Sequence, residues 1–150
     1  MATSAGTTRV ATAEDPLRCA ILISGSGSGM QAMLEHQQNP NCVHITTVVV
    51  SNKQGVKGIE RAKNLDVPTV VVEISPNISG DERRIAHELE IEQVLFDYEV
   101  ELVILSGYMR LLSPQFVERW EGKIVNIHPS LLPDFPGAHA HRDVIASGVK

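Results

Sequence analysis

An asparagine and a histidine, Asn126 and His128, stand two positions apart at the end of an apolar run. If this run is a β-strand, both side chains point to the same side, and Ile127 between them points to the other. An amide can donate a hydrogen bond to an oxygen on which negative charge develops, and an imidazole can transfer protons near neutral pH. The pair therefore suits acyl transfer, although a purely structural strand end could carry the same two residues.

Two other chemistries fit this segment less well. A nucleophilic triad needs a serine or cysteine on a sharp strand-to-helix elbow, and no Ser or Cys here stands in a recognised elbow motif. Zinc needs suitably spaced ligands, but His128, His139 and His141 lack an i, i+4 pair and a nearby carboxylate or cysteine set. We therefore expect no metal.

A second candidate site is the run Ser24–Gly29, which has glycine at every second position. It follows apolar residues 19–23 and precedes a helical pattern that begins at Met30, an arrangement in which backbone amides can surround a phosphate. A simple glycine turn would explain the run equally well. The third glycine comes one residue too early for the dinucleotide fingerprint, and residues 51–53 (Ser-Asn-Lys) offer no acidic group for a ribose. A nicotinamide cofactor is therefore disfavoured.

Short apolar runs alternate with helical patterns along the chain. We expect strands at residues 19–23, 45–51, 69–74, 102–106 and 123–127, and helices at 30–38, 58–65, 81–98 and 114–120. This alternation predicts an α/β fold, an open and mostly parallel Rossmann-like sheet with helices on both faces. Ligands of such sheets bind beyond the carboxyl ends of the strands. That rim would carry Ser24-Gly25, Ser51-Asn52, Ser106-Gly107 and Asn126-Ile127-His128.

The longest predicted helix, residues 81–98, has an amphipathic pattern. Its candidates for packing against the sheet include Ile85, Leu89, Val94 and Leu95.

Length and composition indicate one globular domain. The chain has 150 residues, 43% hydrophobic and 21% charged, with a net charge of −5 and no long basic run. We therefore expect no nucleic-acid surface, whereas backbone amides could still hold a small anion. No apolar run approaches the ~20 residues that span a bilayer.

The terminal segment and the cysteines point to a cytoplasmic protein. Residues 1–16 are rich in Ala, Thr and Ser without an apolar core, which predicts a flexible tail before a domain at residues 17–150. Cys19 and Cys42 fit no metal or redox spacing, so we expect two free thiols in a reducing compartment.

Five segments, in order along the chain, resemble the formyltransferases that use 10-formyltetrahydrofolate, and most of all the phosphoribosylglycinamide formyltransferase family. These segments are Ile23–Ser28, Ser51–Lys53 with Gly58–Ala62, Leu105–Ser113, Asn126–Pro133 and Phe135–His141. The resemblance implies transfer of the formyl group of 10-formyltetrahydrofolate to the amine of glycinamide ribonucleotide, a step of purine (IMP) biosynthesis. It implies no metal.

The resemblance also assigns roles to particular residues. The family's phosphate-binding positions fall on Gly27, Ser28 and Gly29. Asn126 takes the position that stabilises the formyl oxygen, and His128 the position that transfers protons. The folate-binding positions fall on Arg84, Met109, Arg110, Leu111 and Leu112. The three apolar residues of this folate set could instead belong to the core, and Arg84 to a solvated helix face.

The chain departs from the family pattern in two places. Gly29 stands where the family usually has asparagine, which removes one side-chain hydrogen bond to the phosphate, of order 1 kcal/mol. The family's domain also continues beyond the position of Lys150, with further strands and an aspartate that orients the histidine. We therefore expect the domain to be incomplete and to show little or no turnover by itself.

Two alternatives remain beside this interpretation. One is a related folate-dependent formyltransferase or hydrolase with another acceptor, although methionyl-tRNA formyltransferase lacks a phosphate loop of this type. The other is an inactive fragment that acts only as a nucleotide-binding module and does not depend on Asn126 or His128. The expected partners are small molecules, and the sequence leaves open a homodimer or a longer multifunctional chain.

Overall fold

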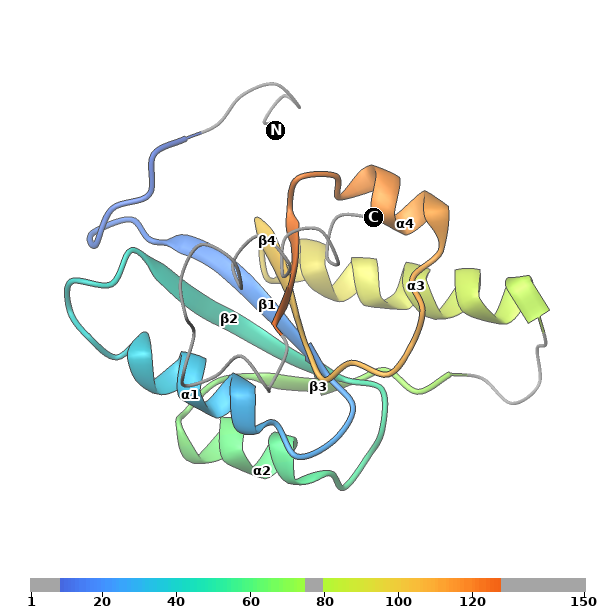
Figure 1. Cartoon of the computed structure of the whole chain (residues 1–150), viewed down its shortest axis with the longest axis horizontal. Helices are drawn as coiled ribbons and strands as arrows, with labels where there is room; N and C mark the ends of the chain where they lie inside the picture. The colour runs from blue at the N-terminus through green and yellow to red at the C-terminus, as the bar shows by residue number, and fades with distance from the viewer. Residues whose placement is uncertain (1–8, 75–79, 128–150) are drawn as a thin grey trace.

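The computed structural model describes residues 9–74 and 80–127 (Figure 1). Strands and helices alternate along them, as predicted, and most ends lie within one or two residues of the predicted ones. The elements are β1 (Leu17–Ile23), α1 (Ser28–His36), β2 (His44–Ser51), α2 (Lys57–Asn64), β3 (Thr69–Val71), α3 (Gly80–Asp97), β4 (Leu102–Ser106), α4 (Pro114–Arg119) and β5 (Ile124–Ile127). The third strand is shorter than predicted, because its partner β2 ends at Ser51, opposite Val71.

The five strands form one parallel sheet in the order β3-β2-β1-β4-β5. The register aligns Leu22 of β1 with Val50 on one side and Leu105 on the other, and Leu105 in turn with Asn126. From β1 the chain adds β2 and then β3 on one side of β1, and it then adds β4 and β5 on the opposite side of β1. The strand order therefore reverses between β1 and β4, and this is where ligands bind in sheets of this class. The predicted α/β fold is confirmed.

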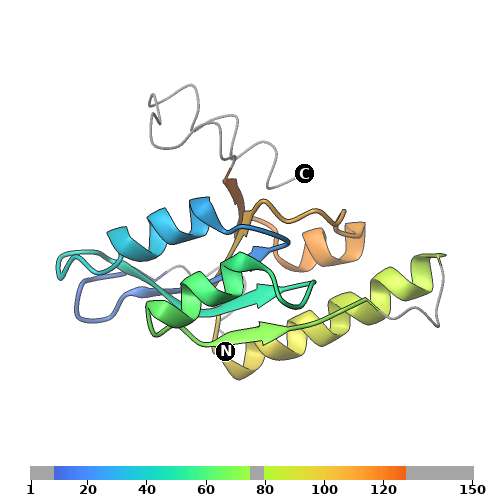
Figure 2. The same ribbon diagram turned by 90° about the horizontal axis from the view of Figure 1, so that it is seen from below.

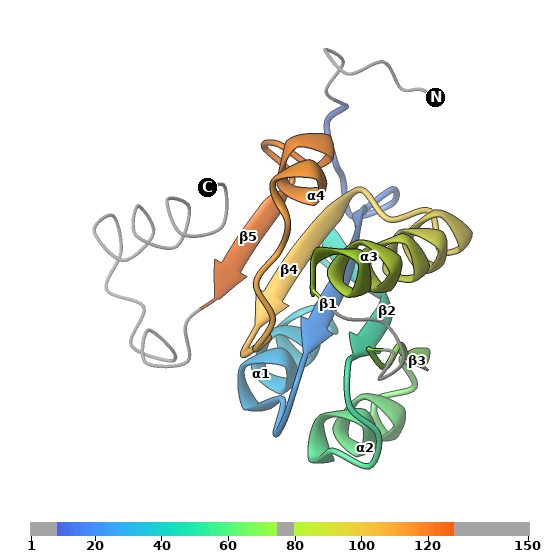
Figure 3. The same cartoon turned by 90° about the vertical axis from the view of Figure 1, so that its right-hand side faces the viewer.

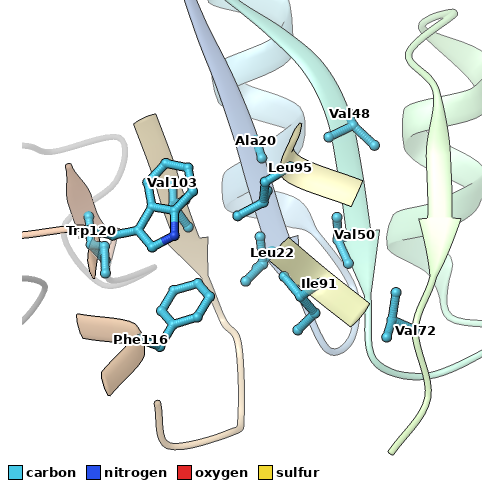
Figure 4. Packing of buried hydrophobic residues seen from close by; sticks show 11 residues of the cluster. Ala20, Leu22, Val48, Val50, Val72, Ile91, Leu95, Val103, Phe116 and Trp120 are labelled. Atoms are coloured by element: carbon cyan, nitrogen blue, oxygen red, sulfur yellow. The ribbon is translucent and has the colours of Figure 1, made fainter. Parts of the chain in front are cut away.

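Helices cover both faces of the sheet, α1 and α2 on one and α3 and α4 on the other (Figures 2 and 3). Side chains of β1 alternate between the two faces, as the two-residue period of a strand requires. Ala20 and Leu22 pack with Phe116 and Trp120 under α3 and α4 (Figure 4). The other face of β1 packs against residues of α1 and α2 that include Met30, Leu34 and Ala62. Strand β1 is thus buried on both faces, which explains why its sequence is continuously apolar.

The buried face of α3 differs from the prediction. Ile85 and Leu89 were expected to pack inward but are 40% and 58% exposed. Leu95 is fully buried, as predicted, and Val94 packs partly against the same cluster. The residues of α3 that are buried are His87, Glu88, Ile91, Glu92 and Leu95. Three of these five are titratable, so apolar periodicity was right for Leu95 and Val94 but wrong for Ile85 and Leu89.

Each buried polar side chain of α3 has partners from another element. The His87 Nε2 atom lies 2.6 Å from the carbonyl oxygen of Val72. The carboxylate of Glu92 accepts hydrogen bonds from the indole Nε1 of Trp120 at 3.0 Å and from Arg119 at 2.7 and 2.9 Å. Satisfied in this way, these groups avoid the large penalty of burying an unpaired polar group. They can therefore face the core, and the apolar residues Ile85 and Leu89 take the outer side.

The segment before β1 is tied to the sheet through one arginine. Arg9 donates to both carboxylate oxygens of Glu101, at 2.6 and 2.7 Å, and to the carbonyl of Pro16. The hydrogen bond from Arg9 lowers the pKa of Glu101 to about 2. The division between a tail at residues 1–16 and a domain from residue 17 stays a prediction. Within the described ranges, no helix combines the length and apolarity needed to cross a membrane.

Candidate active site

A hollow of about 210 Å³ opens where the strand order reverses. It is lined by Ser24–Gly29 after β1 and by Ser106, Gly107 and Met109 after β4. The predicted phosphate loop and the first residue of the predicted folate-binding run therefore share one hollow. Their loops are joined directly, because the backbone N–H of Met109 donates to the Ser24 hydroxyl at 2.8 Å.

The predicted phosphate loop is shaped by a close contact with α2. Gly27 has a φ of +71°, and a β-carbon on it would lie 2.8 Å from the Cα of Gly58. A β-carbon on Gly58 would in turn collide with the Ile23 side chain and approach the carbonyl oxygen of Gly25 to 2.9 Å. The Gly58 N–H donates to that same oxygen at 3.0 Å. Glycine is therefore required at both positions, because a β-carbon on either would collide with the other segment. A simple glycine turn would not require such a close contact.

The loop leads into a helix whose first turn is open to a ligand. Gly27 is the N-cap of α1, and no side chain of the described residues caps it. The first turn contains no acidic residue that would repel an anion. The first amides of a helix lack partners within the helix and attract negative charge. Gly27, Ser28 and Gly29 thus belong to a helix start whose chemistry suits an anion, and their role in phosphate binding stays a prediction.

The run after β4 separates into exposed and buried residues. Met109 and Leu111 are 74% and 78% exposed, whereas Tyr108 and Leu112 pack against the core under α3 and α4. Burial raises the pKa of the Tyr108 hydroxyl above its ordinary value. The core explanation is therefore wrong for Met109 and Leu111 and right for Leu112. Two exposed apolar side chains two positions apart, after the carboxyl end of β4, suit contact with a flat, apolar ligand.

Arg84, predicted to bind folate, lies in a second hollow of about 260 Å³ between α3 and α4. Its lining includes Asp81 and Ile85 of α3 and residues 113–115 at the start of α4. Arg84 is therefore near the end of the run 109–112 and outside the lining of the first hollow. Arg110 has a buried Nε atom with no hydrogen-bond partner in the described part of the chain, so it retains a free donor.

A buried glutamate that sequence reasoning missed holds the end of this run. Glu88 accepts hydrogen bonds from both the backbone N–H and the hydroxyl of Ser113. The Ser113 hydroxyl in turn accepts from the N–H of Phe116 and caps α4. No local signal marks Glu88, because its partner is 25 residues away in sequence. The sequence does carry a signal for the cap, since Ser113 directly precedes Pro114.

Asn52 is a further rim residue to which sequence reasoning assigned no role. It follows β2 and is 9% exposed, and its Oδ1 atom has no hydrogen-bond partner among the residues that the structure describes. A buried acceptor without a partner is unusual in a folded protein. The sequence feature that could have indicated a role for Asn52 is its position directly after a buried strand.

Asn126 lies in β5, half-buried, beside Leu105 of β4. Its neighbour Ile127 packs in the cluster under α1 and α2, so Asn126 points to the opposite face. Tyr108 and Leu112 pack on that opposite face. Asn126 therefore points to the face on which Leu112, the last residue of the predicted folate run, packs. Its catalytic role stays a prediction. His128 lies outside the described residues, as do His139 and His141.

The structure confirms only that neither cysteine is in a disulfide. Cys19 and Cys42 are both free, and Cys19 is fully buried. Burial raises the pKa of Cys19 to about 12, so this thiol stays protonated and is a poor nucleophile.

Known proteins show the same fold and sequence pattern. A family model described as Formyl transferase matches residues 17–150. The trifunctional purine biosynthetic protein adenosine-3 of Gallus gallus is 42% identical over 134 residues, which are 89% of this chain and 13% of that protein. The phosphoribosylglycinamide formyltransferase of Escherichia coli (strain K12) is 37% identical over 130 residues, which are 85% of this chain and 58% of that protein.

A solved structure agrees with these matches. The crystal structure of phosphoribosylglycinamide formyltransferase from Brucella melitensis has a TM-score of 0.69 and 37% sequence identity to this chain. The similarity covers 88% of this chain and 67% of that one. The present chain therefore spans only part of the curated relatives that it matches.

Proposed function

This chain belongs to the formyl transferase family, and from that premise we propose that it transfers the formyl group of 10-formyltetrahydrofolate to the amine of glycinamide ribonucleotide in purine biosynthesis. Its relatives in Escherichia coli and Brucella melitensis are named for phosphoribosylglycinamide as the formyl acceptor. The free thiols and the metabolic step support a cytoplasmic location.

The observation that carries this proposal is the shape of the loop between β1 and α1. A helix N-terminus that no described side chain caps stands where the strand order reverses, and its N-cap glycine packs directly on Gly58. A phosphate bound by Gly27, Ser28 and Gly29 would place the ribonucleotide over the β1–β4 rim. The amine of glycinamide would then extend toward β5 and Asn126.

The folate would occupy the other side of the rim. Met109 and Leu111 are exposed there, Leu112 packs against the core, and the Arg110 Nε has no hydrogen-bond partner among the described residues. Arg84, which lines the second hollow, would bind the acidic end of the folate. Apolar contacts would hold the flat ring system, and charge-assisted hydrogen bonds would hold the carboxylates.

The proposed reaction uses Asn126 and His128. The acceptor amine attacks the formyl carbon, a new C–N bond forms, and the bond to the folate nitrogen breaks. Asn126 donates a hydrogen bond to the formyl oxygen as negative charge develops on it. His128 transfers the proton that leaves the amine to the departing folate nitrogen.

The test combines substrate binding with formyl transfer. Glycinamide ribonucleotide is titrated calorimetrically into the purified chain and into the variants Gly27→Ala and Asn126→Ala, and single-turnover transfer from 10-formyltetrahydrofolate is followed. We expect Gly27→Ala to abolish ribonucleotide binding. Asn126→Ala should leave binding intact and slow transfer by about 100-fold, the usual effect of losing one oxyanion donor.

The control is Asn64→Ala, because Asn64 is exposed at the far end of α2 and should change neither quantity. Ribonucleotide binding without any Asn126-dependent transfer would instead favour the nucleotide-binding module. A chain that does not bind the ribonucleotide would contradict both interpretations.

A further inference from the structure

Three side chains with metal-binding atoms meet where the chain passes from α1 to β2. They are His36, Cys42 and His44, and their ligand atoms all lie within 4.8 Å of one another. His36 is the last residue of α1, and His44 is the first residue of β2. This connection is at the opposite end of the sheet from the Ser24–Gly29 loop (Figure 1), so the cluster is separate from the candidate active site.

Backbone hydrogen bonds hold the connection in place. The N–H of Asn39 donates to the carbonyl of His36 at 3.2 Å, and the N–H of Cys42 donates to the carbonyl of Asn39 at 2.9 Å. These turns bring Cys42 back toward the end of α1. The next residue, Val43, accepts a hydrogen bond from Leu17 at the start of β1. Two of the three side chains thus stand on regular elements, and the third stands on a turn bonded to them.

The two imidazole rings lie slightly farther apart than a shared ion requires. The ring centroids of His36 and His44 are 5.7 Å apart. On one tetrahedral ion with Zn–N distances of about 2.0 Å, two imidazole centroids lie about 5 Å apart, and neighbouring ligand atoms about 3.5 Å apart. Small rotations of exposed or half-buried side chains would therefore close the cluster around an ion.

Gln37 supplies the outer contact that metal-bound histidines ordinarily have. Its amide nitrogen lies 2.8 Å from His44 Nδ1, and its amide oxygen accepts from the Thr46 hydroxyl at 2.7 Å. If His44 binds an ion through Nε2, its Nδ1 carries a proton and must donate. A half-turn of the Gln37 amide then presents its oxygen to His44 and its nitrogen to Thr46, whose hydroxyl can also accept. Both hydrogen bonds survive with reversed direction.

We propose that His36, Cys42 and His44 bind one divalent transition-metal ion of the Zn²⁺ class, with water as the fourth ligand. Two imidazoles and a thiolate favour such borderline ions over Mg²⁺ or Ca²⁺, which prefer oxygen ligands. The ion would also lie at the negative end of the α1 dipole. The ion would restrict motion of the α1–β2 connection and so stabilise α1, the helix that begins in the candidate phosphate loop.

The test is a titration of the metal-free full chain with Co²⁺, followed by competition with Zn²⁺. We expect one Co²⁺ per chain, a thiolate-to-cobalt charge-transfer absorption, and complete displacement by Zn²⁺. Cys42→Ser should abolish the charge-transfer absorption, and His36→Gln and His44→Gln should each weaken binding at least tenfold. Zn²⁺ should raise the melting temperature of the parent chain more than that of any of the three variants.

Two matched controls separate this cluster from the other thiol and the other histidines. Cys19→Ala removes the buried cysteine of β1, and His139→Gln combined with His141→Gln removes two histidines near the C-terminus. Both should bind Co²⁺ like the parent chain. Circular dichroism checks that each variant is folded, and His36→Gln is the safest because His36 is exposed. The proposal is overturned if folded His36→Gln and Cys42→Ser bind Co²⁺ like the parent, or if the parent does not bind one Co²⁺.

Discussion

Two helices of this protein begin in opposite ways. Helix α4 starts after Ser113, whose hydroxyl accepts from the N–H of Phe116, and Pro114 removes one further unpaired donor. Helix α1 starts after Gly27, in a left-handed conformation and without a side-chain cap in the described structure. The sequence around α4 satisfies its own amides, whereas the sequence around α1 leaves them open.

The surroundings of the two helix starts deepen this difference. Ser113 is 3% exposed and donates two hydrogen bonds to Glu88 of α3, so the start of α4 is buried and fixed to the neighbouring helix. The start of α1 lines the hollow at the strand reversal, and its geometry depends on glycine contacts with α2. An open helix start that is rigidly supported can bind an anion without rearranging, and a capped start cannot.

The largest expected effect comes from Gly58→Ala. In the interior of a helix, this change ordinarily stabilises by about 1 kcal/mol. Here the new β-carbon would meet Ile23 and the Gly25 carbonyl oxygen, so we expect a loss of about 3 kcal/mol and of ribonucleotide binding. Urea unfolding and calorimetry measure the two quantities. Gly25→Ala is the control for stability, because its β-carbon would meet nothing within 4 Å. A stabilised Gly58→Ala chain would show that the loop does not rest on α2.

Glu88→Ala should damage the start of α4 while sparing that of α1. It leaves the buried N–H of Ser113 without its acceptor, and we expect a loss of about 2 kcal/mol in unfolding free energy. Folate binding should weaken as the run 109–112 loosens, whereas ribonucleotide binding should stay unchanged. Unfolding in urea and separate titrations of the two substrates check this. Glu90→Ala, on the exposed side of α3, is the matched control.

A pair of serine variants compares the two helix starts directly. Ser113→Ala removes a cap and should lower the free energy of unfolding by about 1 kcal/mol without changing ribonucleotide binding. Ser28→Ala should weaken ribonucleotide binding without lowering the free energy of unfolding, because Ser28 is a predicted phosphate contact and caps no helix in the described structure. Equal losses of stability in the two variants would contradict the contrast between a closed and an open start.

The smallest expected effect is a gain. Gly29→Asn adds a side-chain amide to the first turn of α1, at a buried position where the resemblance implies asparagine. We expect tighter ribonucleotide binding by about 1 kcal/mol, from one added hydrogen bond to the phosphate. Calorimetric titration measures it, with Gly55→Asn as control because Gly55 stands in open space outside the candidate site. An unchanged dissociation constant would contradict the prediction that an asparagine side chain at position 29 binds the phosphate.

Much of this contrast was predictable from the sequence. The glycines of Ser24–Gly29 indicated an anion site or a simple turn, and the strand ends predicted a common rim. The parallel sheet confirms the rim. The interior of α3 was not predictable. Ile85 and Leu89 repeat at helical spacing, yet His87 and Glu88 face inward because Val72 and Ser113 meet them there.

Sequence alone determined the order of the elements, the approximate ends of each, and which residues stand at the carboxyl ends of the strands. These features depend on backbone preferences and on side-chain period over a few neighbouring residues. Tertiary structure decided which face of α3 is buried, that Gly58 lies against Gly27, and that His36, Cys42 and His44 converge. A buried polar group or a close backbone contact depends on a partner that only the folded chain brings near, and local sequence carries no record of that partner.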